Sequence, residues 1–320
     1  VRRSLVVLVT GASGYIASHC VALLLNDGYR VRGTVRSLKN DKKVAPVKKL
    51  DQGNRLELVE ADLLKEDCWE SVVSGCDYVL HIASPFPIVS DATCIDIAVN
   101  GTLNVLRAVA KEPRVKKVVL TSSCAAVNGY TLNSSFSHFQ VISLYAPTIT
   151  FRFKLTCLNP TLVVGPLLID EEGASVSLMR RFLNGEMPAV PELNLALVDV
   201  RDVAKAHLLA MQCPETDGER LLVGINHSKY YAKLSGFWVP RLQAPYIVLW
   251  LYSFFDKEAA ACLNRVGHTI RFDNSKAKRL LGMEFNDPAV AMVEMGYSLI
   301  ERGIVKKRPG YKGVPSKYKL

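Results

Sequence analysis

A short apolar strand that runs straight into a glycine-rich turn constrains the fold of this chain more than any other feature. Residues 5–9 are Leu-Val-Val-Leu-Val, and residues 10–17 are Thr-Gly-Ala-Ser-Gly-Tyr-Ile-Ala. Gly11 and Gly14 let the backbone turn tightly and come close to a ligand, and the small Ala17 lets the following helix pack on the strand. The unpaired N–H groups at the start of that helix attract phosphate. This arrangement predicts a binding site for the pyrophosphate of a dinucleotide.

Apolar runs alternate with amphipathic segments through the first 120 residues. The expected strands lie near 5–10, 29–35, 55–60, 77–83 and 115–122, and the expected helices near 14–26, 39–50, 65–74 and 96–111. Such alternation is typical of an α/β fold, a doubly wound parallel sheet of the Rossmann type with helices on both faces. The hydroxyl side chains of residues 121–123 come at the carboxyl end of the last of these strands, where ligands bind in such sheets.

The second half of the chain predicts a smaller C-terminal lobe for substrate. After a core strand near 153–158, the expected elements are helices near 174–184 and 202–212 and strands near 195–198 and 220–223. We therefore expect a dinucleotide-binding core over 1–165, with a shortened crossover near 124–152. A mixed lobe would cover 166–305, with some elements returning to the core, and a basic tail would cover 306–320.

The net charge of +10 does not by itself indicate a nucleic-acid partner, because it is concentrated in two blocks. Residues 36–49 hold six Lys/Arg and one acid, residues 301–320 hold seven and one, and the rest of the chain is about neutral. The terminal block is typical of a solvated tail. The first block lies where an anionic ligand is expected, so we expect a small-molecule partner and no nucleic acid.

Cysteine spacing and hydropathy favour a cytoplasmic protein without a membrane span. The eight cysteines include no Cys-x-x-Cys pair, and no signal-peptide pattern precedes the first strand. The longest apolar stretch, 245–255, is shorter than the roughly 20 residues that a bilayer requires. We expect it to form a buried helix, with contact at a membrane surface as the alternative.

The histidines do not indicate a metal site. The six of them form no pair at i and i+4 and no cluster with cysteines at ligand spacing. His81 lies inside an apolar strand, so we expect it to be a hydrogen-bonded core residue. His207 is expected to pack a helix.

The end of the second strand favours NADP(H) over NAD(H). A ribose 2′-hydroxyl requires an acid at this position, whereas a 2′-phosphate requires a cation. The strand ends in Arg36 and offers no acid, and Lys42 and Lys43 follow closely. A guanidinium binds phosphate through two parallel hydrogen bonds.

Several motifs, taken together and in order, resemble those of the extended short-chain dehydrogenase/reductases, which belong to the NAD-dependent epimerase/dehydratase family. They lie at residues 9–17, 31–36, 61–63, 81–85, 100–102, 121–123, 159–166 and 198–204. Within this family the chain is most similar to the dihydroflavonol reductase and cinnamoyl-CoA reductase-like branch. The resemblance implies an NADP-dependent oxidoreductase that reduces a ketone or aldehyde, or oxidises the matching secondary alcohol.

The resemblance also implies roles for individual residues. The pyrophosphate would be held by Gly11, Ser13, Gly14, Tyr15 and Ile16, and the 2′-phosphate by Arg36 and Lys43. The adenine would be bordered by Asp62 and Leu63, the ribose by Ala83, and the nicotinamide by Pro160, Thr161, Leu162 and Val163. Ser123, with Ser122 as the alternative, would be the catalytic serine that donates a hydrogen bond to the substrate carbonyl. Asp62 is equally a candidate cap for a helix start at 63–65.

One element of the family pattern is missing. The proton donor of the family is a Tyr-x-x-x-Lys pair, in which residues four apart share a helix face. Here Tyr130 is followed at that spacing by Ser134, and Tyr145 by Ile149. Residues 131–150 are rich in serine and β-branched residues and predict a poor helix. Either an altered gene model or splice form has removed or replaced the catalytic helix, or the chain is a genuine member with a remodelled active site.

The missing Tyr-x-x-x-Lys pair leaves two alternative functions. The first is an NADP-dependent oxidoreductase in which Ser123 binds the carbonyl and Tyr145 or water replaces the missing donor. The second is a catalytically impaired NADP-binding protein, or a shortened isoform, that docks the cofactor without turnover.

Overall fold

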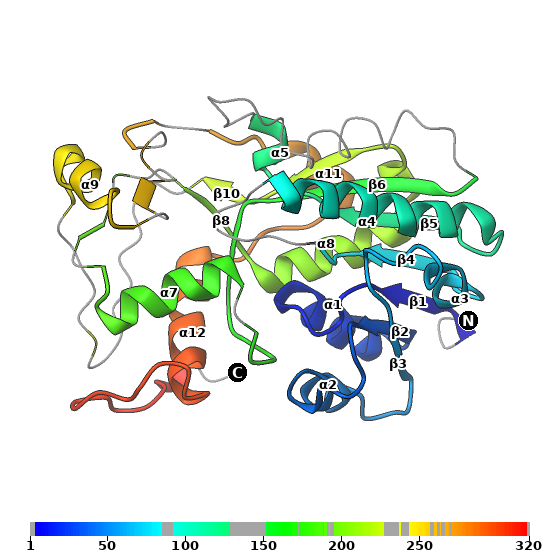
Figure 1. The fold of residues 1–320 in the computed structure, drawn as a ribbon, viewed down its shortest axis with the longest axis horizontal. Coiled ribbons are helices and arrows are strands. Elements are labelled where there is room, and N and C mark those ends of the chain that lie inside the picture. The colour runs from blue at the N-terminus through cyan, green and yellow to red at the C-terminus, as the bar shows by residue number, and fades with distance from the viewer. Residues whose placement is uncertain are drawn as a thin grey trace.

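Figure 1 shows the fold of the chain in a computed structural model. The structure describes residues 4–84, 92–128, 152–171, 173–187, 189–190, 192, 195–226, 237, 243–256, 259–260, 263, 266–268 and 271–318. Tyr130 and Tyr145 lie outside the described residues, as does most of the predicted crossover at 124–152. The described beginning of that crossover is a single short helix, α5 (Ala125–Asn128).

The centre of the molecule is a seven-stranded sheet in the order β3-β2-β1-β4-β5-β6-β9. Every neighbouring pair in it is parallel. The strands are β1 (Val6–Val9), β2 (Arg30–Val35), β3 (Leu56–Glu60), β4 (Tyr78–His81), β5 (Lys117–Thr121), β6 (Lys154–Pro160) and β9 (Arg220–Val223). The strand order reverses direction between β1 and β4, and this is where ligands bind in doubly wound sheets. The predicted Rossmann-type fold is confirmed.

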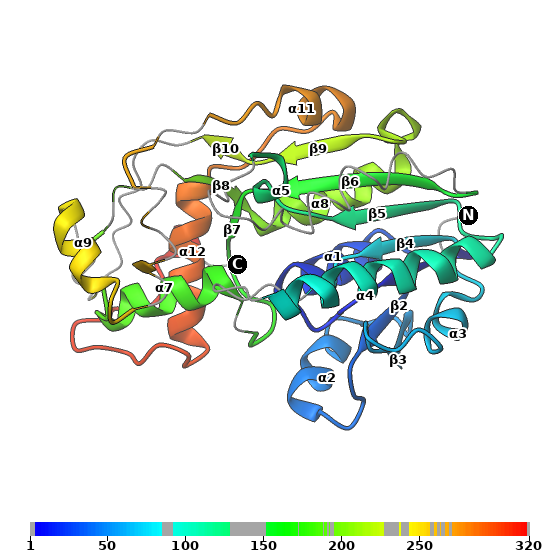
Figure 2. The same cartoon turned by 45° about the horizontal axis from the view of Figure 1, so that its top comes forward.

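Helices cover both faces of this sheet, as Figures 1 and 2 show. The two core clusters divide by strand alternation: Val7 and Val9 of β1 pack on one face, and Leu8 packs on the other. The first face carries α1 (Tyr15–Asn26) and α8 (Val200–Gln212), and the opposite face carries α3 (Trp69–Val73) and α4 (Ala92–Lys111). The helix after β2 is α2 (Asp41–Lys48). Residues of α8 and β9 thus return to the core sheet from the second half of the chain.

The smaller sheet and the helices around it lie at the end of the large sheet to which the strands point (Figure 2). A three-stranded sheet consists of β7 (Leu162–Val164), β8 (Ala196–Asp199) and β10 (Ile225–Asn226). Around it lie α7 (Ala174–Asn184), α9 (Tyr246–Tyr252) and α12 (Pro288–Glu301), while α11 (Ser275–Leu281) contacts β9. Two short 3₁₀ turns are η3 (Pro214–Thr216) and η5 (Ser316–Tyr318).

The expectation of a buried helix at 245–255 is wrong. Leu249 is buried, but six of the seven residues of α9 are at least 42% exposed, and Phe255 beyond it is 89% exposed. Every side of the helix is apolar. Because only Leu249 packs inward, the apolar side chains on the other sides face solvent. No helix in the described part of the chain is long and apolar enough to cross a membrane.

The basic tail is not simply a solvated run of charge. Tyr311 and Tyr318 pack against Tyr297 of α12, with ring centroids 6.4 and 5.6 Å apart. Lys306, before the first of these tyrosines, and Lys312, between the two, are exposed. The aromatic residues therefore attach the tail to the lobe, while the lysines stay in water.

Candidate cofactor and substrate site

The turn after β1 is held by hydrogen bonds from the neighbouring strand. Gly11 has φ of +66°, and its N–H donates to Oγ1 of Thr34 at 2.9 Å. The N–H of Ala12 donates to the carbonyl oxygen of Thr34 at 2.8 Å. A Cβ on Gly11 would lie 3.0 Å from Cβ of Ala83, at the end of β4. The turn therefore needs glycine both for its left-handed backbone and for its close approach to β4.

The start of α1 presents free backbone donors. Gly14 caps the helix without a side-chain hydrogen bond, and its own N–H donates to the carbonyl oxygen of Gly11 at 2.8 Å. Within the described residues, the N–H groups of Ser13, Tyr15, Ile16 and Ala17 have no partner. Such unpaired donors at the positive end of a helix form an anion site. The residues present therefore fit a pyrophosphate.

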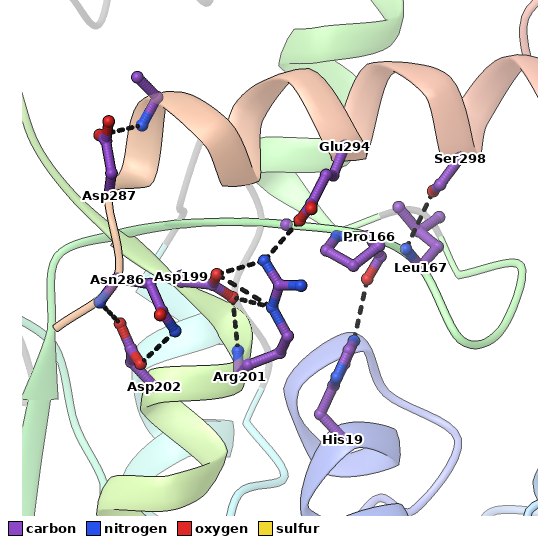
Figure 3. Close-up of polar contacts among 12 residues, drawn as sticks. His19, Pro166, Leu167, Asp199, Arg201, Asp202, Asn286, Asp287, Glu294 and Ser298 are labelled. Atoms are coloured by element: carbon purple, nitrogen blue, oxygen red, sulfur yellow. Dashed lines mark hydrogen bonds and ion pairs between the residues drawn. The ribbon is translucent and has the colours of Figure 1, made fainter. Parts of the chain in front are cut away.

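The side chain of Tyr15 is not part of this cradle. Its hydroxyl donates to the carbonyl oxygen of Gly165 at 2.8 Å, and burial raises its pKa well above the ordinary range. One helical turn later, Nε2 of His19 donates to the carbonyl oxygen of Pro166 at 2.9 Å (Figure 3). These bonds attach α1 to the segment that follows β7. Of the role predicted for Tyr15, only its backbone N–H is available.

His81 is a hydrogen-bonded core residue, as the sequence predicted. Oγ1 of Thr10 accepts from the N–H groups of Ile82 and Ala83 at 2.9 Å, so its own proton donates to Nδ1 of His81 at 3.0 Å. Nε2 of His81 then donates to Oγ1 of Thr102 at 3.3 Å. Burial lowers the pKa of His81 to about 4, which keeps the ring neutral. This network fixes the end of β4 against β1.

The two cations predicted for the 2′-phosphate differ in their surroundings. Arg36 follows β2, is exposed, and forms no ion pair within the described part of the chain. Lys43, on α2, has its Nζ 3.0 and 2.8 Å from the two carboxylate oxygens of Glu171. Arg36 is thus available to a ligand, whereas Lys43 already has an anionic partner.

Asp62 and Leu63 lie in a hydrogen-bonded turn after β3. Oδ1 of Asp62 accepts from the N–H of Leu64 at 3.0 Å, and its carbonyl oxygen accepts from Nε1 of Trp69 at 3.1 Å. The carboxylate therefore caps a turn and not a helix, and α3 begins only at Trp69. A Cβ on Gly101 would lie 2.8 Å from Cβ of Leu63, so α4 crosses this turn closely.

The carboxyl ends of β5 and β6 hold buried oxygens without partners. Oγ of Ser122, Oδ1 of Asn159 and Oγ1 of Thr161 are buried, and none of them has a hydrogen-bond partner among the residues that the structure describes. Ser123 is less buried, and its Oγ accepts from the N–H of Ala125 at 3.2 Å, at the start of α5. Pro160 ends β6, and its carbonyl oxygen accepts from the N–H of Cys124 at 2.9 Å.

Leu162 and Val163 continue from this edge into β7, in the smaller sheet. The residues predicted for the nicotinamide and the carbonyl therefore lie at the ends of two adjacent strands. Unpaired buried polar atoms are rare in proteins and are typical of places that receive a ligand.

Behind this edge, His207 does more than pack a helix. Its Nδ1 donates to the carbonyl oxygen of Val203 at 2.8 Å, so Nε2 is the acceptor for the hydroxyl of Thr121 at 2.6 Å. Burial lowers the pKa of His207 to about 4. The neutral ring thus positions the last residue of β5.

A charged network joins α8 to α12 beside the site (Figure 3). Asp199 is fully buried, caps α8 through the N–H of Arg201 at 2.8 Å, and pairs with the Arg201 guanidinium, which also contacts Glu294. Asp202 accepts two hydrogen bonds from Asn286, at 2.7 and 2.8 Å, and burial raises its pKa to about 6. Asp199, Arg201 and Asp202 belong to the 198–204 motif. Their bonds to Glu294 and Asn286 join α8 to the region of α12.

Sequence reasoning missed Thr34, Gly33 and Glu171 as residues that shape the site. A Cβ on Gly33 would lie 2.7 Å from Cβ of Ala12, so a larger residue in β2 would displace the glycine turn. A glycine inside a strand is a signal of such close approach. For Glu171, 128 residues from Lys43, the sequence contains no comparable signal.

Comparison with known proteins places the chain in a family. The family model described as "NAD dependent epimerase/dehydratase family" matches residues 7–148. Cinnamoyl-CoA reductase CAD2 of Medicago truncatula is 36% identical over 93% of this chain and 96% of its own length. This chain belongs to the NAD-dependent epimerase/dehydratase family. Its relatives are those of the dihydroflavonol reductase and cinnamoyl-CoA reductase-like branch, which confirms the family predicted from the motifs.

Two further comparisons agree. Cinnamoyl-CoA reductase 1 of Arabidopsis thaliana is 33% identical over 93% of this chain and 90% of its own length. Among solved structures, yeast methylglyoxal/isovaleraldehyde reductase Gre2 complexed with NADPH matches with a TM-score of 0.69 and 25% identity. That match covers 94% of this chain and all of the Gre2 chain. The family and these relatives indicate an oxidoreductase.

Proposed function

We propose that this chain binds NADPH and reduces the carbonyl group of a small molecule. The observation that carries the proposal is the free anion cradle at the start of α1, with the unpaired guanidinium of Arg36 at the adjacent strand end. A cradle alone fits any dinucleotide, and the guanidinium adds the preference for a 2′-phosphate. The similarity to cinnamoyl-CoA reductases, and to a structure complexed with NADPH, supports the same cofactor.

Different residues of this chain would bind different parts of the cofactor and the substrate. The N–H groups of residues 13 and 15–17 would hold the pyrophosphate, with Gly11 and Gly14 providing the space. Asp62 and Leu63 would border the adenine, and Ala83 the ribose. When bound, NADPH would supply a hydride to the carbonyl carbon. The substrate oxygen would accept a hydrogen bond from Ser123 or Ser122 and would take the proton that completes the alcohol from water or from Tyr145.

The second candidate function is cofactor binding without turnover. No tyrosine in the 320-residue sequence is followed by lysine at the fourth position. Loss of a general acid lowers the rate by about 10²–10⁴-fold. The hydroxyl of Tyr15 cannot replace it, since it is buried and donates to Gly165.

Cofactor binding can be tested by NADPH fluorescence titration of the wild-type chain and of Arg36→Ala. The substitution removes a charge-assisted contact worth about 1.5–3 kcal/mol, so NADPH affinity should fall by about 10–100-fold while NADH affinity stays the same. Arg30→Ala, at the opposite end of β2, is the matched control and should change neither. If the wild-type chain and Arg36→Ala have the same preference between NADPH and NADH, the proposed cofactor is wrong.

Turnover is measured separately, as oxidation of NADPH in the presence of a panel of aldehydes and ketones. Oxidation that depends on both protein and carbonyl supports the reductase. NADPH docking without oxidation supports the second candidate.

A further inference from the structure

The bidentate ion pair between Lys43 and Glu171 joins two distant parts of the molecule. Lys43 lies on α2 of the cofactor core, and Glu171 lies in the segment between β7 and α7. Both side chains reach solvent, with 39% of Lys43 and 27% of Glu171 exposed. The ammonium group of Lys43 is therefore partly open to solvent, the side from which a ligand phosphate would approach.

Glu171 stands on a segment that is fixed in place. The carbonyl oxygens of Gly165 and Pro166 accept from α1. From the other side, Arg302 donates to the carbonyl oxygens of Leu167 and Leu168 and to the carboxylate of Asp170, at 3.0, 2.7 and 2.6 Å. The position of Glu171 is thus determined by contacts of its neighbours with two helices, and does not depend on its ion pair alone.

A carboxylate in this position has a consequence for the site. The inference rests on the proposed binding of NADPH. The resemblance to the family implies that Lys43 binds the 2′-phosphate together with Arg36, yet the ammonium group of Lys43 is already paired with Glu171. We infer that Glu171 competes with the 2′-phosphate of the cofactor for Lys43 and thereby limits the preference for NADPH over NADH. Accessible ion pairs are weak, at about 0–1 kcal/mol, so a phosphate dianion can displace this one. The carboxylate then stays nearby as a like charge, which weakens phosphate binding further.

The test compares NADPH with NADH, and adenosine 2′,5′-bisphosphate with adenosine 5′-phosphate, by equilibrium titration. Glu171→Gln should tighten binding of the two 2′-phosphorylated ligands by about 2–10-fold and leave the other two within about twofold. The matched control is Asp170→Asn. It also removes one negative charge, but the carboxylate of Asp170, one residue before Glu171, pairs with Arg302 and not with Lys43. It should leave the ratio of affinities unchanged.

A double-mutant cycle shows whether the effect acts through the lysine. Lys43→Gln should weaken binding of the 2′-phosphorylated ligands, and in that background Glu171→Gln should have a much smaller effect than in the wild type. Equal thermal unfolding midpoints of the variants would show that all of them fold.

Each contrary result has its own meaning. The inference is wrong if Glu171→Gln leaves the ratio unchanged, if Asp170→Asn raises it equally, or if the full effect persists in Lys43→Gln. In these cases the wild-type preference for NADPH still supports the proposed function. A wild-type chain that binds none of the four ligands contradicts both.

Discussion

The two ends of the candidate site differ in whether their buried polar side chains are hydrogen-bonded. At the end of β1 and β4, the hydroxyl of Thr10 makes three hydrogen bonds, and His81 is paired at both ring nitrogens. At the ends of β5 and β6, the side-chain oxygens of Ser122, Asn159 and Thr161 are buried and have no partner within the described part of the chain. At the first end these side chains are fully paired without a ligand and only backbone N–H groups remain free, whereas at the second end side-chain oxygens remain unpaired.

This difference separates holding a cofactor from acting on a substrate. A turn held in place by its neighbours' hydrogen bonds needs little further ordering when a pyrophosphate binds to its free N–H groups. Unpaired oxygens cost stability in the free protein, and a ligand that bonds to them recovers that cost. The comparison leads to four predictions, in order of decreasing expected effect on the free energy of unfolding.

Acid should destabilise both ends of the site by similar amounts, because each end holds a buried neutral histidine. The pKa of His81 and that of His207 are each about 4 in the folded protein because of burial, against about 6.5 when unfolded. The unfolded chain therefore binds more protons between pH 6.5 and 4, and stability falls as the pH falls through this window. By pH 5 each histidine should lower the free energy of unfolding by about 2 kcal/mol.

Urea unfolding at pH 7.5 and pH 5 measures this loss. Asp202 acts in the opposite direction, because its pKa is raised to about 6 and the folded protein gains a proton there first. His81→Asn and His207→Asn should each reduce the pH dependence by the same amount. Unequal reductions would mean that only one ring is held neutral.

Thr10→Val should destabilise the protein by about 3 kcal/mol, because it leaves two partly buried N–H groups and a buried ring nitrogen unpaired. Thr10→Ser keeps the hydroxyl and should cost about 1 kcal/mol for the lost methyl group. Chemical denaturation of both variants checks the difference. Equal losses would show that packing, and not hydrogen bonding, holds this end together.

Gly11→Ala should cost about 2 kcal/mol and lower NADPH affinity by about tenfold, since the residue has φ of +66° and would contact Ala83. Gly75→Ala is the control. Gly75 has φ of +73°, but nothing lies within 4 Å of its added Cβ. It should show only the backbone strain, about 1 kcal/mol, with unchanged affinity. An affinity loss in both variants would point to general destabilisation.

Ser122→Ala should be neutral or should stabilise the protein by up to about 1 kcal/mol, because the lost hydroxyl is buried without a partner. Ser18→Ala makes the same chemical change where the hydroxyl donates to the carbonyl oxygen of Tyr15 at 2.9 Å. That variant should lose about 1 kcal/mol. If thermal unfolding shows the two variants equally destabilised, the two ends do not differ in the way proposed here.

Most of the fold could be predicted because its signals are local. Strand β1 at Val6–Val9 and helix α1 at Tyr15–Asn26 lie within the ranges that the apolar pattern predicted. The start of α3 was predicted four residues early, since the hydrogen bonds of Asp62 hold the chain in a turn. The exposure of α9 was not predictable, because an apolar helix looks the same whether or not other elements cover it.

The sequence by itself determined the alternation of strands and helices, the glycine turn and the cation at the end of β2. Each of these depends on residues that are adjacent in the chain. Only the tertiary structure decided that Glu171 meets Lys43 and that Asp199 is buried beside Arg201 and α12. The same holds for the three oxygens at the ends of β5 and β6, which find no partner among the described residues. Contacts of this kind join segments far apart in sequence. They depend on how the lobe packs against the sheet, and no local pattern encodes that packing.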